Sequence, residues 1–439
     1  MKTVLNIFTL LVTLFAFNTN AKPLEFTPNV MAPTHIQSEQ EWKEFEEQLD
    51  KIKEVGVHAI ATQIWWGLVE TTDNNFNWQY YERLSSLITS KGYKWIPHIA
   101  FHSCSEISQK NCNISLPHWI WNKYPEKLKY KDESGSTSTE SISVWATEII
   151  LDDYKDFLIS FHDRFSNISD SIEEVTLGIG PKGELRYPSF TDVQDNGKNQ
   201  AHSQLALESY RQFLKSKYKT IDNVNSVWES EYEDFSEIYS LRDSDLDIEN
   251  QTTKDFYHWY NQSLIDHSEI LLTTASRIFT EEKSLLRNIS LGVKIPNIHW
   301  GRTAELNAGL IRIDENFLNE SIGLSYNHLI SSIKNSIELT KNESIFFTYT
   351  ALEKSNIDKA SRANDLVSQV AKLALESNIK IRGENSTSNK FGSNQTWDNM
   401  WSAIQNNNYS GLTLYRIENI TSNPLAFDFL EWIIDNMKN

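Results

Sequence analysis

Two glutamates, Glu184 and Glu384, have surroundings that suit acid–base chemistry. Glu184 lies in GIGPKGELRYPSF, residues 178–190, directly after the apolar run VTLGIG. Glu384 lies in IKIRGEN, residues 379–385, where a β-rich run passes through Gly383. Acids that follow strands of a parallel α/β fold lie on its reaction face. Two such acids are what cleavage of a glycosidic bond requires, because one protonates the leaving oxygen while the other activates water or attacks the sugar.

The elements that must position these acids are eight short β-rich runs, which alternate with helical stretches. The runs are NVMAP (29–33), HAIATQIWW (58–66), KWIPHIAF (94–101), EVTLGIG (174–180), ISLGVKIP (289–296), SIFFTYTAL (344–352), IKIRGE (379–384) and SGLTLYRI (410–417). Such alternation indicates a parallel sheet, so we predict the α/β class and a (β/α)8 barrel. Glu184 then follows the fourth strand and Glu384 the seventh, on one rim of the barrel.

Apolar residues spaced three or four apart predict the intervening helices. We expect helices over residues 38–56, 80–92, 365–378 and 396–408. Two connections, residues 102–150 and 185–288, are too long for a bare barrel, and long loops at the reaction face usually build a substrate cleft or a lid. The second contains a helical stretch over 252–280, which we expect to form part of the barrel wall.

Composition narrows the classes of partner. The chain has 439 residues without a Pro/Ser/Gly linker, which predicts one domain. Its net charge of −18 argues against nucleic acid or an anionic membrane, since phosphates are bound by basic patches. Neutral substrates fit better, and the fourteen Trp residues suit stacking on sugars as well as core packing. A monomer is expected.

The first residues and the cysteines indicate export. MKTVLNIFTLLVTLFAFNTNA has an early Lys, an apolar middle and a small-residue end near Ala21, the pattern of a secretory signal peptide. We therefore expect residues 1–21 to be removed and the mature protein to be periplasmic or extracellular. Cys104 and Cys112 are expected to form one disulfide in an exported chain, with two free thiols as the alternative.

The segment GPKGELRYPSF resembles GPAGELRYPSY of the β-amylases, which are inverting exo-acting glucanases on a (β/α)8 barrel. Further matches occur in the family's order along nearly the whole mature chain. They are QIWWGLVE (63–70), FHSC (101–104), KIPNIHW (294–300), TALE (350–353), RGEN (382–385) and LTLYR (412–416). Six motifs in register are far more specific than one.

The resemblance implies that Glu184 is the general acid and Glu384 the general base. Inversion then requires the two carboxyl groups to stand about 6.5–9.5 Å apart, so that water fits between the base and the sugar. The resemblance also implies sugar contacts, or support for the acids, from Gln63, His102, Lys110, Lys294, His299, Thr350, Asn385 and Arg416. For Trp65, Trp66 and Trp300, core packing is an alternative to sugar stacking.

Two departures bear on the substrate. The family's DxWWG begins here with Gln63, so a carboxylate expected beside the sugar is a neutral amide. The family's mobile loop HQCGGNVGDDC reads HSCSEISQKNC, without glycines and with Lys110 in place of an aspartate. Loss of glycine predicts a stiffer flap.

Accessory features follow from the same resemblance. Bacterial members can carry Ca²⁺, and Glu70, Asp73 and Glu140 are oxygen donors in corresponding regions, although an acidic surface is the alternative. No cofactor is expected to be required. The chain stops about twenty residues after the eighth run, which we interpret as room for one helix and no starch-binding module.

Two other functions stay open on the residues alone. A retaining barrel glycosidase also places acids after strands four and seven, although such enzymes usually have Asn before the first acid, where this chain has Gly183. A noncatalytic glucan-binding protein would explain the Gln63 and Lys110 changes, yet it would have no reason to retain both glutamates. A third alternative is a hydrolase of the β-amylase type whose glycan specificity has shifted.

Overall fold

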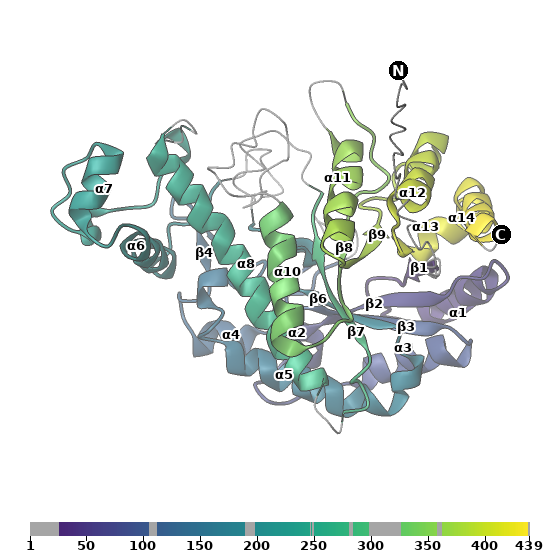
Figure 1. Ribbon diagram of the computed structural model, residues 1–439. Coiled ribbons are helices and arrows are strands. Elements are labelled where there is room, and N and C mark those ends of the chain that lie inside the picture. Colours follow the sequence, from purple (N-terminus) through teal and green to yellow (C-terminus); the bar gives the residue numbers. More distant parts are fainter. Residues whose placement is uncertain are drawn as a thin grey trace, which may run out of the picture.

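Eight parallel strands close into a barrel in the computed structural model (Figure 1). The structure describes residues 26–104, 112–188, 198–245, 247, 250–280, 284–297, 326–357 and 362–437. The barrel strands are β1 (Thr27–Met31), β2 (Ala59–Trp65), β3 (Lys94–Ala100), β6 (Glu174–Gly178), β7 (Ser290–Ile295), β8 (Ile345–Tyr349), β9 (Lys380–Glu384) and β10 (Gly411–Leu414). Their order around the barrel follows the chain, and β10 pairs with β1 to close it. The predicted (β/α)8 barrel is confirmed.

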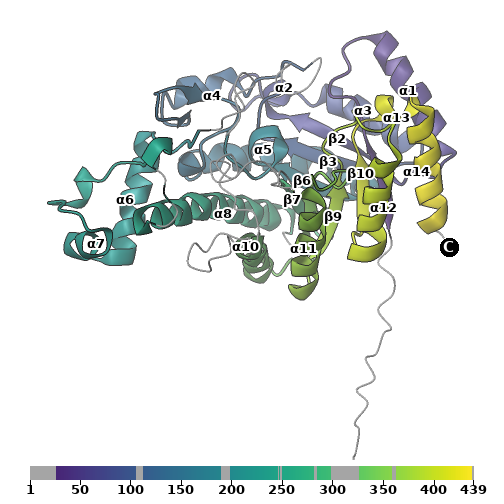
Figure 2. The same cartoon turned by 90° about the horizontal axis from the view of Figure 1, so that it is seen from above.

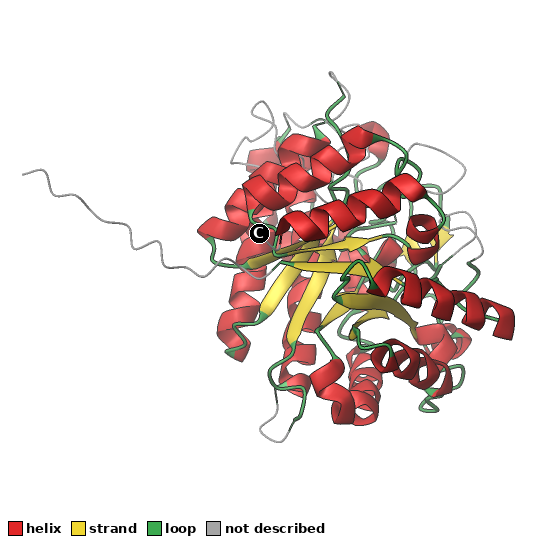
Figure 3. Cartoon of the chain, turned by 90° about the vertical axis from the view of Figure 1, so that its right-hand side faces the viewer, coloured by secondary structure: helices red, strands yellow, loops and turns green. Residues whose placement is uncertain are grey.

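Helices cover the outside of the barrel, with the strands at its centre (Figure 3). Those that the periodicity predicts are α1 (Glu39–Lys53), α3 (Gln79–Ser90), α8 (Gln251–Phe279), α11 (Ala363–Glu376) and α12 (Asn394–Asn407), joined by α5 (Leu151–Phe165) and α10 (Tyr326–Thr340). Helix α1 illustrates the local cause. Ser38 and Glu41 form a capping box at its start, and Trp42, Phe45 and Leu49 form its buried face.

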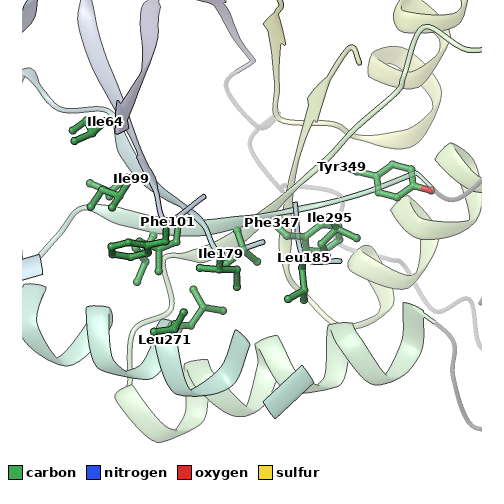
Figure 4. Close-up of a cluster of buried hydrophobic side chains, with 14 of the residues drawn as sticks. Ile64, Ile99, Phe101, Ile179, Leu185, Leu271, Ile295, Phe347 and Tyr349 are labelled. Atoms are coloured by element: carbon green, nitrogen blue, oxygen red, sulfur yellow. The ribbon is translucent and has the colours of Figure 1, made fainter. Parts of the chain in front are cut away.

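The main core lies between the strands and this helical layer. Figure 4 shows Ile99 and Phe347 on the strands above Leu271 of α8. These side chains are at most 1% exposed, as is Trp95 on β3. Burial of such side chains contributes about 1.5–3 kcal/mol each, so the strand ends that carry the site are held rigidly.

The two long connections form most of the structure outside the barrel. After β3 come α4 (His118–Lys123) and a hairpin of β4 (Tyr130–Lys131) and β5 (Thr137–Ser138). After β6 come α6 (Gln204–Tyr218) and α7 (Ile221–Trp228), which project away from the barrel (Figures 1 and 2), and then α8. Helix α8 contacts β7 and α10, so the expectation that this connection completes the wall is confirmed.

Three details differ from the sequence predictions. The strand predicted over 344–352 ends at Tyr349, and that over 410–417 ends at Leu414, because the chain turns toward the pocket there. Two helices follow β10 rather than one: α13 (Ile417–Thr421) and α14 (Pro424–Met437). Proline at the first position of α14 permits this break. None of the described helices is both long and apolar enough to cross a membrane.

Candidate active site

A cavity of about 320 Å³ opens where the barrel strands end, and both glutamates line it. Of the other predicted site residues, Gln63, His102, Lys294, Thr350 and Asn385 also line this cavity. Arg416 lies behind it and contacts Gln63. Lys110, His299 and Trp300 lie outside the described residues.

Glu184 follows a tight turn between β6 and the barrel rim. The turn passes through Lys182 and Gly183, which both have left-handed backbone, with φ of 59° and 78°. The Thr350 hydroxyl donates to Glu184 Oε1 at 2.9 Å. The Arg186 guanidinium lies 3.6 Å from the other carboxylate oxygen. Glu184 therefore has one neutral and one charged neighbour, and its side chain is 15% exposed toward the cavity.

The segment after Glu184 is anchored on both sides. The Leu185 amide donates to the Lys294 carbonyl of β7 at 2.9 Å. Tyr187 stacks on Tyr260 of α8 with ring centroids 3.8 Å apart, and its hydroxyl donates to the Tyr260 carbonyl at 2.6 Å. Sequence analysis missed this anchor, although the Tyr in the GELRYPS motif was a visible signal. The anchored segment cannot shift without disrupting packing around α8.

Glu384 is the last residue of β9, which ends where the predicted run over 379–384 ends. The Lys294 ammonium lies 2.8 Å from Oε1 and 2.7 Å from Oε2 of Glu384. Both side chains are at most 10% exposed. One ammonium therefore contacts both oxygens of the nearly buried Glu384 carboxylate, which fixes the orientation of that side chain.

Glu353 organises the loop that follows Glu384, a role that sequence analysis missed. Its carboxylate accepts hydrogen bonds from the Ser386 amide and hydroxyl and from the Thr387 amide, at 2.7–3.2 Å. Burial raises the pKa of Glu353, while the bonds from Ser386 oppose that rise. Asn385 braces the same loop, because its amide donates to the Thr387 carbonyl and its side-chain oxygen accepts from the Tyr415 amide. Glu353 ends the TALE motif, which was the available signal.

Gln63 acts as the partner of a buried cation. The Arg416 guanidinium is 3% exposed and donates to Gln63 Oε1 and to the Ala32 carbonyl, both at 2.7 Å. Among the described residues no carboxylate pairs with Arg416. Because residue 63 is a neutral Gln, the Arg416 guanidinium donates to two neutral acceptors, the Gln63 amide and the Ala32 carbonyl.

Replacing Gln63 by Glu should stabilise the protein by about 1–3 kcal/mol, because an ionised carboxylate would replace a neutral amide as the acceptor of a buried guanidinium. Thermal unfolding would show a higher midpoint. Gln63→Leu, which has similar bulk and no acceptor, should lower it. A midpoint for Gln63→Glu at or below that of the wild type would contradict this account.

His102 presents a ring nitrogen toward the turn that carries the acid. Its Nδ1 donates to the Ser103 carbonyl at 2.9 Å, so Nε2 holds the lone pair in the neutral ring. That Nε2 is buried without a partner in the described structure. Burial, with a smaller effect of Lys294, lowers the pKa of His102 to about 4. His102 is therefore a neutral acceptor packed against the turn that carries Glu184.

The buried histidines predict an acid-sensitive fold. Burial also lowers the pKa of His267 to about 4, whereas an unfolded histidine titrates near 6.5. The unfolded chain then binds more protons between these values, so stability falls as pH drops from about 6.5 to 4, by roughly 3 kcal/mol for each histidine. Denaturant unfolding across this range measures the loss. His267→Asn should flatten the pH dependence, and the exposed control His118→Asn should not.

The remaining predicted side chains have clear positions. Cys104 and Cys112 form a disulfide. Trp65 lines the cavity edge-on to His102, and its ring nitrogen donates to the Thr34 carbonyl. Trp66 is fully buried against Phe101, so core packing accounts for it.

The oxygen donors expected for Ca²⁺ do not form a cation site among the described residues. Glu70 accepts from Trp66 Nε1 and the Asn74 amide, at 2.6 and 2.8 Å. The Lys123 ammonium pairs with Asp73 and with Asp153. The described part of the chain contains no group of three acidic, His or Cys side chains placed to hold a metal. Glu70 and Asp73 are thus already partnered by other groups of the chain.

Chelation should accordingly leave stability unchanged. We expect the same unfolding midpoint, within about 1 °C, before and after dialysis against EDTA. The reason is that the Lys123 ammonium already supplies positive charge to Asp73 and Asp153. Differential scanning calorimetry with and without added Ca²⁺ measures this. A rise in midpoint that increases with Ca²⁺ concentration would overturn the prediction.

Known proteins match both the sequence and this geometry. The glycosyl hydrolase family 14 profile matches residues 29–438. The chain is 31% identical over 407 residues to a thermophilic β-amylase of Thermoanaerobacterium thermosulfurigenes, covering 90% of this chain and 70% of the relative. It is 31% identical over 414 residues to a β-amylase of Niallia circulans, covering 91% and 68%.

Solved structures agree. The crystal structure of the catalytic domain of a β-amylase from Paenibacillus polymyxa superposes with a TM-score of 0.83 at 28% identity, covering 95% of this chain and all of that one. A β-galactosidase from Marinomonas ef1 superposes with a TM-score of 0.62 at 11% identity, over 94% of this chain and 60% of that one, and so shares the fold alone. The chain therefore belongs to glycosyl hydrolase family 14 and is a β-amylase-like glycoside hydrolase.

Proposed function

We propose that this enzyme is exported and releases β-maltose from the nonreducing ends of α-1,4-glucans by inversion, with Glu184 as general acid and Glu384 as general base. Its similarity to β-amylases supports an α-glucan substrate. Export rests on the signal-peptide pattern of residues 1–21.

The single observation that carries the role assignment is the difference between the two carboxylate environments. Lys294 holds both oxygens of Glu384, which suits a base that must stay ionised. Glu184 instead contacts the Thr350 hydroxyl, which can donate to the ionised acid or accept from the protonated one. Two titratable groups in contrasting surroundings is the arrangement expected of an acid and a base.

In the proposed reaction Glu184 gives its proton to the leaving glycosidic oxygen. Glu384 takes a proton from water as that water attacks the anomeric carbon from the opposite face. Glu353 positions the loop beside Glu384 through its hydrogen bonds to Ser386 and Thr387. The anomeric configuration therefore inverts.

Proton NMR of maltoheptaose hydrolysis tests this function. We expect β-maltose to appear first and then to mutarotate. Early α-maltose would instead identify a retaining glycosidase. Sugar binding without any product would identify a glucan-binding protein.

A further inference from the structure

We propose that the leaving-group side of this cavity binds a glucan whose sugar carries an anionic substituent, such as a phosphate ester, and that Lys182 and Lys354 recognise it. The proposal rests on the proposed function, because it concerns the substrate of the same site.

The charge lining the cavity carries the first step. Four cations line it, Lys182, Arg186, Lys294 and Lys354, against the two acids. Arg186 lies by Glu184 and Lys294 is paired with Glu384. In the described part of the chain, no carboxylate lies within 4.0 Å of the ammonium of either remaining lysine. Among the described residues, the lining of the cavity thus carries surplus positive charge, although the net charge of the chain is −18.

The position of Lys354 indicates which side of the cavity would bind the anionic substituent. Its ammonium is partly buried, and burial lowers its pKa, with Glu353 and Glu184 opposing and Lys390 and Lys182 adding to the shift. Lys354 therefore interacts with Glu184, the general acid. Lys182 and Lys390 lie close enough to repel the Lys354 ammonium. The sugar beside a general acid is the leaving one, so these cations face the leaving-group side.

Lys182 supplies a second, independent observation. It occupies a left-handed backbone position, with φ of 59°, that favours glycine or asparagine. The resembling β-amylase segment has alanine there. The turn therefore has no backbone reason for a lysine, and the exposed Lys182 is one of the residues that line the cavity.

The ligand chemistry follows from these donors. A neutral hydroxyl would leave the partly buried Lys354 ammonium without a compensating charge, whereas an oxyanion can accept from both Lys354 and Lys182. Thr387 lines the same cavity. Its hydroxyl oxygen accepts a hydrogen bond from the Asn389 amide, so the hydroxyl proton of Thr387 points away from that amide. A phosphate or carboxylate group on the sugar provides the matching acceptors.

Calorimetric titration tests the proposal without requiring turnover. The probes are maltose, maltose bearing one 6-phosphate, a disaccharide with a glucuronic acid carboxylate, and inorganic phosphate. We expect the phosphorylated sugar to bind about tenfold more tightly than maltose, the gain expected of one charge-assisted bond. That preference should shrink as salt is raised.

The variants Lys182→Gly and Lys354→Met, alone and combined, should reduce the phosphate preference. Lys372→Met, on the exposed face of α11, should retain it. Equal affinity for phosphorylated and plain maltose would overturn the proposal, as would a preference that survives both changes. Inorganic phosphate binding as tightly as the phosphorylated sugar would also overturn it, since the site would then serve a free anion. The carboxylate probe tells which substituent is preferred.

Hydrolysis of plain maltoheptaose is measured in parallel. Absence of that reaction would refute the proposed function, whereas the binding preference addresses the anionic substituent alone. The two failures are therefore distinguishable.

Discussion

Replacing Glu384 by Gln should lower kcat for maltoheptaose by about 10²–10⁴-fold, because the amide cannot take a proton from the attacking water. Gln has nearly the same shape as Glu, so the Lys294 ammonium keeps one oxygen acceptor. Reducing-sugar release under saturating substrate measures kcat. The exposed control Glu376→Gln on α11 should retain wild-type activity.

A substrate whose leaving group needs no proton distinguishes the general acid from the general base. Glu184→Gln should be as slow as Glu384→Gln on maltoheptaose, but it should recover much of its rate on α-maltosyl fluoride, because fluoride departs without a proton. Glu384→Gln should stay slow on both substrates. Recovery by Glu384→Gln instead would reverse the assignment, and wild-type rates in both variants would remove these residues from the mechanism.

Replacing Gly183 by Ala should lower kcat by about 10²-fold, a loss typical of a catalytic group displaced by about 1 Å. An added Cβ would lie 2.7 Å from His98 Nε2 and 3.1 Å from His102 Nε2. Both rings are buried, so the turn must move and carry Glu184 with it. The left-handed φ adds about 1–2 kcal/mol of instability.

Two glycines provide matched controls for this change. Gly135 also has positive φ, and its nearest contact would be the flexible end of Lys131 at 3.7 Å. Gly135→Ala should therefore cost stability and leave kcat unchanged. Gly392→Ala meets nothing within 4 Å and should change neither. Steady-state kinetics and unfolding midpoints on all three variants decide the point. Normal kcat in Gly183→Ala would contradict the proposed rigidity of the turn.

The sequence allowed the barrel to be predicted because local patterns determine its strands. Runs such as KWIPHIAF are mostly apolar, as expected of strands buried on both faces, and the alternation with helices limits the topology. Strand ends were less accurate. At Tyr349 and Leu414 the chain leaves the sheet while its residues still have β-forming character, because contacts from distant segments decide where pairing stops.

Within the site, the positions of the two acids followed from the strand order, whereas their partners did not. The contact of Lys294 with Glu384 spans 90 residues, and that of Arg416 with Gln63 spans 353. The helix and strand periodicity of the sequence gives no information about contacts between residues so far apart in the chain. Glu353 illustrates the same limit, since its three donors come from a loop more than thirty residues away.

Lys294 connects the two acids through a single residue. Its carbonyl accepts from the amide of Leu185, next to Glu184, while its ammonium holds Glu384. Both contacts depend on the position of β7, the strand that carries Lys294. A displacement of this one strand would therefore disturb the supports of the acid and of the base together.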